Sequence, residues 1–112
     1  MRVVAIATDL MMVSRIAAAA DVAAVTLTRL RSPRELGPVA DTDLVIVDWA
    51  EREPWWAESL VAWRADAQVP IVLFGQHTDR EAHRAAREAG LGPMWARSRL
   101  MRELPRLVAP AR

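Results

Sequence analysis

The chain has 112 residues, of which 53% are hydrophobic and 26% charged, and its net charge is +1. This length allows one hydrophobic core, and this composition is typical of a globular domain. No apolar run approaches the roughly 20 residues of a membrane span, and the N-terminus lacks the layout of a signal peptide, so we expect a cytoplasmic protein without membrane contact. Cysteine is absent, which excludes disulfides, thiolate nucleophiles and cysteine-bound zinc.

All 15 basic residues are arginine, so the chain contains no lysine. This excludes the phosphate-binding lysine of P-loops and Schiff-base chemistry. The arginines are interspersed with 14 acidic residues instead of forming a basic stripe. We therefore expect no nucleic-acid partner.

The first part of the chain alternates between strand and helix patterns. The β-branched run at residues 3–7 predicts a buried strand, and the helical pattern at 10–20 follows it with Asp9 as the N-cap. Residues 25–28 are rich in β-formers and predict a second strand. The sequence SPRE at 32–35 has the form of a capping box and predicts a helix of one or two turns.

The rest of the chain continues the alternation. Residues 44–47 are all apolar, which is typical of a strand covered on both faces. The remaining strands are expected at residues 69–74 and 94–96, and the remaining helices at 53–67, 78–90 and 102–108, the last one short or kinked because it contains Pro105. Such a pattern predicts a single α/β domain, residues 1–112, in which a parallel sheet is covered by helices on both faces, an open doubly wound fold.

In an open doubly wound fold, the ligand crevice lies outside the carboxyl ends of the strands. The residues expected at this edge are Thr8 and Asp9, Asp48, the segment 75–77 and Arg97. Any chemistry of this chain should therefore be carried by these few positions.

Three stretches at these strand ends resemble the receiver domain of two-component response regulators, and the likeness spans nearly the whole chain. LVIVDWA resembles the third strand of receivers, whose last aspartate accepts a phosphoryl group from a histidine kinase. VPIVLFG resembles the fourth strand, and AGLGPMWARS resembles the segment that delivers an invariant lysine. The resemblance implies a flavodoxin-like sheet of five parallel strands in the order 2-1-3-4-5.

The resemblance implies roles for three residues in phosphoryl transfer. Asp48 stands at the position of the phosphoacceptor. Asp9 and the backbone carbonyl of Ala50 stand at positions that bind magnesium together with that acceptor, and we expect this chain to bind the ion weakly. The metal offsets the negative charge that builds up when a carboxylate attacks a phosphoryl group.

Three other positions depart from the receiver pattern. Thr8 stands where receivers have the first acid of a pair, Gly75 where they have a threonine or serine, and Arg97 where they have the lysine. Arginine is a cation, but its planar fork does not replace a compact ammonium group. The hydroxyl and the lysine that would sense a phosphoryl group are therefore missing.

We accordingly expect a stand-alone pseudo-receiver. It would not be an enzyme but a signalling or adaptor module that binds a protein partner, either a kinase or an effector in trans, with its phosphorylation switch weakened or lost. In this interpretation Asp48 is a structural acid that pairs with Arg97. Two alternatives stay open: a working phospho-receiver of a phosphorelay, modified on Asp48, and a small-molecule-binding domain with the same fold.

Two surfaces are candidate interfaces. Trp49 and Trp55 follow the third strand, and exposed aromatic residues are favoured at interfaces because they bury a large area. Trp56 and Trp63 are instead expected in the core. The resemblance implies a second interface, for homodimer formation, on the last strand and helix, at Trp95, Leu100, Met101 and Leu104.

Overall fold

The sheet of the computed structural model, which describes residues 1–109, has five parallel strands. They are β1 (Arg2–Ile6), β2 (Thr26–Leu30), β3 (Leu44–Asp48), β4 (Ile71–Gly75) and β5 (Met94–Ala96). The order is β2-β1-β3-β4-β5, and every neighbouring pair is parallel. The flavodoxin-like, doubly wound fold and its strand order are therefore confirmed.

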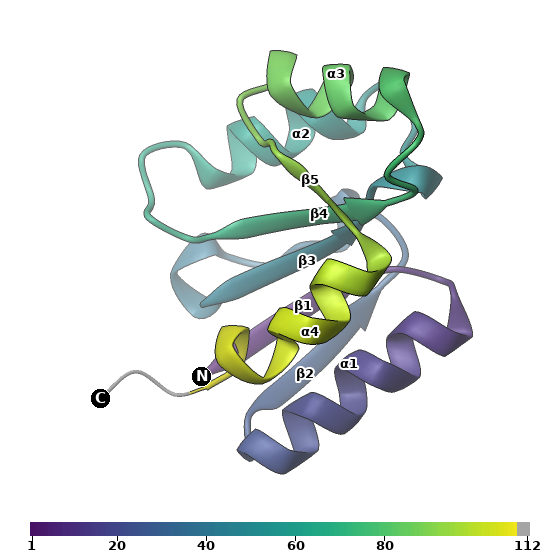
Figure 1. Ribbon diagram of the computed structural model, residues 1–112. Helices are drawn as coiled ribbons and strands as arrows, with labels where there is room; N and C mark the ends of the chain where they lie inside the picture. Colours follow the sequence, from purple (N-terminus) through teal and green to yellow (C-terminus); the bar gives the residue numbers. More distant parts are fainter. Residues whose placement is uncertain (110–112) are drawn as a thin grey trace.

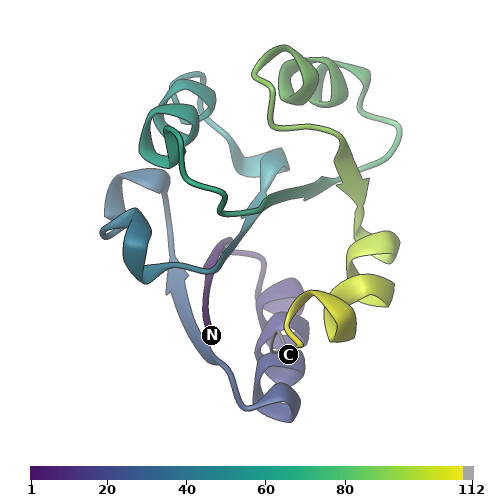
Figure 2. The ribbon, with the colours of Figure 1, turned by 90° about the vertical axis from the view of Figure 1, so that its left-hand side faces the viewer.

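Four α-helices cover the sheet, two on each face (Figures 1 and 2). Helices α1 (Leu10–Ala23) and α4 (Arg97–Leu107) lie on one face, and α2 (Trp56–Arg64) and α3 (Arg80–Glu88) on the other. Three short 3₁₀ helices complete the fold: η1 (Pro33–Glu35), η2 (Val39–Asp41) and η3 (Trp49–Glu51). Within residues 1–109, no helix has the length and apolarity that crossing a membrane requires.

The two faces of the sheet are buried in two separate clusters, because successive side chains of a strand point to opposite faces. In β3, Val45 and Val47 pack toward α2 and α3, whereas Leu44 and Ile46 pack toward α1 and α4. All residues of β3 and β4 are buried. Burial on both faces explains why these two strands are continuous apolar runs in the sequence.

The connection from β2 to β3 contains η1 and η2 instead of an α-helix. Ser32 caps η1 by accepting a hydrogen bond from the Arg34 amide at 3.2 Å, as the sequence predicts. The segment then passes Pro38 and forms only a second 3₁₀ turn. The helix of one or two turns expected here is thus reduced to single turns.

Helix α4 begins at Arg97, five residues before the predicted start at residue 102. Its apolar face is formed by the buried Leu100 and Leu104, which are four residues apart, and the charged residues Arg102 and Glu103 between them hide this pattern. Pro105 lies inside the last turn and does not end the helix, which continues to Leu107. The position of this start matters because it brings Arg97 to the edge of the sheet.

Candidate functional site

The carboxyl ends of the strands meet at one edge of the sheet, as expected for parallel strands. Asp48 is paired with Phe74 of β4, and Gly75 is paired with Ala96 of β5. Ile6, near the end of β1, is paired with Val47 of β3. This register brings together the positions that the sequence singled out: Thr8, Asp48, Gly75 and Arg97.

Asp48 is buried at this edge, with only 1% of its surface exposed. Its Oδ1 accepts a hydrogen bond from the Ala50 amide at 3.2 Å, which caps η3. Burial raises the pKa of Asp48 from its ordinary value of 3.8 to about 6, and the nearby negative charge of Glu51 adds to this effect. The Ala50 amide and the positive charge of Arg97 act in the opposite direction.

Glu51 is the member of the site that sequence reasoning missed. It lies on η3, three residues after Asp48, and its Oε1 accepts a hydrogen bond from the Thr8 hydroxyl at 2.5 Å. Thr8, at the position where receivers have an acid, therefore binds an acid that comes from another loop. The sequence DWAE, with an N-cap residue followed by glutamate at the third position, has the form of a capping box and could have indicated this turn.

Asp9 acts as the N-cap of α1, as predicted. Its Oδ1 accepts hydrogen bonds from the amides of Met11 and Met12, at 3.0 and 3.3 Å. Within residues 1–109 there is no group of three or more histidine, aspartate or glutamate side chains that could hold a metal ion. Because Asp9 is engaged as the cap of α1, it does not join Asp48 and Glu51 in such a group, and we derive no chemistry through a magnesium ion.

Gly75 packs closely against a side chain of the neighbouring strand. A Cβ atom on this residue would lie 2.9 Å from Sδ of Met94, closer than carbon and sulfur can approach. Met94 is itself buried, with 4% of its surface exposed. A threonine or serine at position 75 is therefore accommodated only if Met94 moves.

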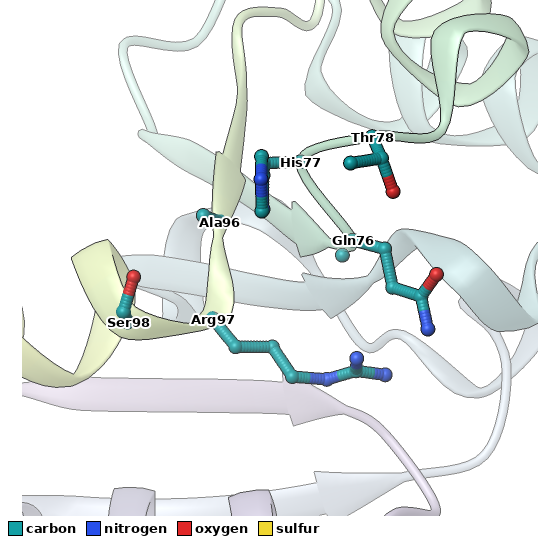
Figure 3. A pocket seen from close by; sticks show the side chains of 7 residues that line it. Gln76, His77, Thr78, Ala96, Arg97 and Ser98 are labelled. Atoms are coloured by element: carbon teal, nitrogen blue, oxygen red, sulfur yellow. The ribbon is translucent and has the colours of Figure 1, made fainter.

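Arg97 does not pair with Asp48, which corrects the prediction of an ion pair. No ion pair within residues 1–109 involves Arg97, and its Nε lies buried with no hydrogen-bond acceptor. Figure 3 shows its side chain extended along the sheet edge below Gln76. The pair fails because Asp48 is held inside by the Ala50 amide and Glu51, so Arg97 acts on it only through its charge.

Trp49 was expected at an interface, and this expectation is wrong. The side chain is fully buried, and its indole N–H donates a hydrogen bond to the Ala82 carbonyl of α3 at 3.0 Å. The guanidinium of Arg52 lies over the ring, 5.3 Å from its centre. This hydrogen bond ties the loop after β3 to α3.

Leu100 and Leu104 were also expected at an interface, and both are core residues, with 0% and 3% exposure. They pack against the sheet in the cluster that contains Phe74. The reason is that both leucines lie on one face of α4, four residues apart, and this face packs against the sheet. The predicted homodimer surface is thereby reduced to Trp95 and Met101, which are half-buried.

The other tryptophans divide between the core and its border. Trp56 is buried, as predicted, whereas Trp63 is half-buried and donates a hydrogen bond to the Gly37 carbonyl at 2.8 Å. Trp55 is half-buried and packs edge-to-face on Trp56 with ring centres 6.2 Å apart. Trp55 therefore keeps part of the exposure that an interface residue needs.

No model of a known protein family matches the chain, and no curated protein matches it either. Among solved structures, that of a response regulator protein from Burkholderia multivorans is similar over 99% of this chain and 97% of that chain. The TM-score is 0.68 and the sequence identity 24%. The likeness shows that the two chains share a fold over their whole length.

Proposed function

We propose that the chain is a pseudo-receiver: a signalling or adaptor module that binds a protein partner in trans, without catalysis and without a tightly held metal ion. The proposal rests on the residues that lie at the edge of the sheet where the strands end. The fold is similar to that of a response regulator protein, yet the positions expected to hold a phosphoryl group contain a glycine packed on Met94 and Arg97, which forms no ion pair within residues 1–109.

The environment of Asp48 also argues against efficient phosphorylation. A carboxylate with 1% exposure offers little surface to an incoming phosphoryl donor. Such a donor is an anion, and the charge of Glu51 beside Asp48 opposes its approach. The positive charge of Arg97 acts on Asp48, but Arg97 forms no ion pair with this carboxylate.

A phosphorylation assay tests the proposal. The protein is incubated with acetyl phosphate and magnesium, and the fraction that gains one phosphoryl group is measured by intact mass spectrometry. Asp48→Asn serves as the matched control, because it removes the acceptor while its side-chain oxygen can still accept the hydrogen bond from the Ala50 amide. We expect wild type to show little more adduct than this variant.

The contradicting result is a magnesium-dependent adduct on nearly every wild-type chain that is absent from Asp48→Asn. It would favour the alternative of a working phospho-receiver. Formation of a homodimer through Trp95 and Met101 stays a separate prediction. The similarity of the fold does not bear on it.

A further inference from the structure

A cavity of about 340 Å³ lies between the loop after β3 and helices α2 and α3. It is lined by residues 49, 52–54, 57, 81 and 85. The sheet-edge positions Gly75 and Arg97 line a different cavity. Whatever binds between the loop and the two helices is therefore bound away from the positions of phosphoryl transfer.

One hydrogen bond brings the two sides of this cavity together. The Trp49 indole N–H donates to the Ala82 carbonyl of α3 at 3.0 Å. Arg52 follows Trp49 by three residues on the loop, and Glu81 directly precedes Ala82 on α3. The bond thus sets a cation of the loop and an acid of the helix on the wall of the same cavity.

The charged side chains that line the cavity do not neutralise one another. They are Arg52, Glu53 and Glu81. Within residues 1–109 none of the three belongs to an ion pair. A ligand that carries both a negative and a positive group can therefore satisfy charges of both signs here, which a simple anion or a simple cation cannot.

Two of these charges are held in place by hydrogen bonds to their neighbours. Arg52 Nη1 donates to the Trp49 carbonyl at 3.0 Å, and the guanidinium lies over the Trp49 ring, 5.3 Å from its centre. Because a guanidinium has five N–H donors, others can still bind a carboxylate. Glu53 Oε2 accepts a hydrogen bond from the Trp55 indole N–H. Groups that are already ordered lose less entropy when a ligand binds.

The rest of the wall is apolar and is formed by the Trp49 ring, Pro54, Ala57 and Ala85. The volume of about 340 Å³ lies at the lower end of the roughly 300 to 1,000 Å³ that small-molecule pockets have. The cavity thus offers an apolar surface beside a cation and an acid, on the scale of a small metabolite.

We propose that this cavity binds a small zwitterion of the amino-acid class. Its carboxylate lies on Arg52, its ammonium group on Glu81, and its apolar side chain against the apolar wall. Glu81 is the partner of the ammonium group because the Glu53 carboxylate already accepts the Trp55 indole N–H. The site goes beyond the proposed adaptor function and does not depend on modification of Asp48.

The test is a titration of ¹⁵N-labelled protein with alanine, leucine and phenylalanine, which share the zwitterion and differ in the size of the side chain. We expect saturable amide shifts at residues 49–57 and 81–85 with at least one of them, and a dissociation constant of about 1 mM or lower. Absence of saturable shifts with all three at about 20 mM would overturn the proposal.

Analogues that lack one charge test the zwitterion. For leucine, these are leucinamide, which has no carboxylate, and 4-methylpentanoate, which has no ammonium group; for alanine or phenylalanine, the corresponding amide and deaminated acid are used. Each analogue should bind about threefold to tenfold more weakly than its amino acid. An amide that binds as tightly as the amino acid would identify a site for cations, an acid that does so a site for anions, and either result would overturn the proposal.

Variants assign the two charges. Arg52→Gln should weaken amino-acid binding about tenfold and remove the advantage over the amide, while the advantage over the deaminated acid stays. Glu81→Gln should do the reverse, with a weakening of about threefold because Glu81 is exposed. A merely structural role of either residue would weaken all ligands alike. Thermal melts check that each variant is folded.

Matched controls come from residues that do not line the cavity. Arg34 also lies over a tryptophan, 5.1 Å from the ring centre of Trp55, and Glu88 lies on the same helix as Glu81. Arg34→Gln and Glu88→Gln should change the affinity less than about twofold. Equal weakening by Arg52→Gln and Arg34→Gln would overturn the proposal, as would shifts centred on residues 75–78 and 96–98, which line the cavity at the sheet edge.

Discussion

Replacement of Asp48 by asparagine should stabilise the protein at neutral pH. The wild-type carboxyl is buried beside Glu51, and its pKa is raised from 3.8 to about 6. Such a group favours the folded state while it is protonated and opposes folding once it is ionised. Asparagine at this position carries no charge, and its side-chain oxygen can accept the same hydrogen bond from the Ala50 amide.

The magnitude and its pH range follow from the two pKa values. Below about pH 4, Asp48 is protonated in both the folded and the unfolded chain, so its burial does not lower the free energy of unfolding. Between about pH 4 and pH 6 the folded protein still binds a proton that the unfolded chain has released, and the free energy of unfolding decreases as pH rises. A pKa shift of about two units corresponds to about 3 kcal/mol. The wild-type protein has lost this amount of unfolding free energy by pH 7.

Urea unfolding of wild type and Asp48→Asn between pH 4 and pH 8 measures this quantity. The difference in unfolding free energy, variant minus wild type, should increase by about 3 kcal/mol across this range and level off above pH 7. Subtracting the two profiles cancels the titration of shared carboxylates that do not interact with Asp48. A difference that stays constant with pH would refute the argument that burial destabilises the ionised form of Asp48. Glu51→Gln should move the increase to lower pH, because it removes the second largest cause.

Two further substitutions test the packing around the site. Trp49→Phe removes the hydrogen bond to the Ala82 carbonyl and should lower the free energy of unfolding by about 1 kcal/mol in urea, whereas an unchanged value would mean that this bond does not hold the loop. Gly75→Ser should destabilise the protein by about 1 kcal/mol because its Cβ displaces the end of the Met94 side chain, and the loss should be smaller in Gly75→Ser/Met94→Ala than the sum of the single losses. Additive losses would show that Met94 is not the obstacle.

The sheet was predictable because its signals are local. The apolar runs at β3 and β4 and the short helical segments between strands are enough to predict a parallel sheet, and its register then brings Asp48 and Gly75 to one edge. Asp9 was assigned correctly for the same reason, since a capping residue bonds to amides two and three positions away.

The errors concern contacts between distant parts of the chain. Trp49 is buried because its indole N–H meets the Ala82 carbonyl, 33 residues later, which no local pattern reveals. The predicted pair of Asp48 and Arg97 assumed that opposite charges at one edge meet, but Glu51 and the Ala50 amide hold the carboxylate inside. Nothing local shows that Met94 fills the space beside a glycine on the neighbouring strand.

The central proposal is that the acid at the end of β3, Asp48, lacks the neighbouring groups that would respond to its phosphorylation. Amide spectra of wild type and Asp48→Asn, each recorded with magnesium and the phosphoryl mimic beryllofluoride, test it most directly. The account predicts that both proteins respond alike around residues 75–78 and the start of α4, since Gly75 has no hydroxyl that could bind a mimic held on Asp48. A large response in wild type that Asp48→Asn lacks would contradict it.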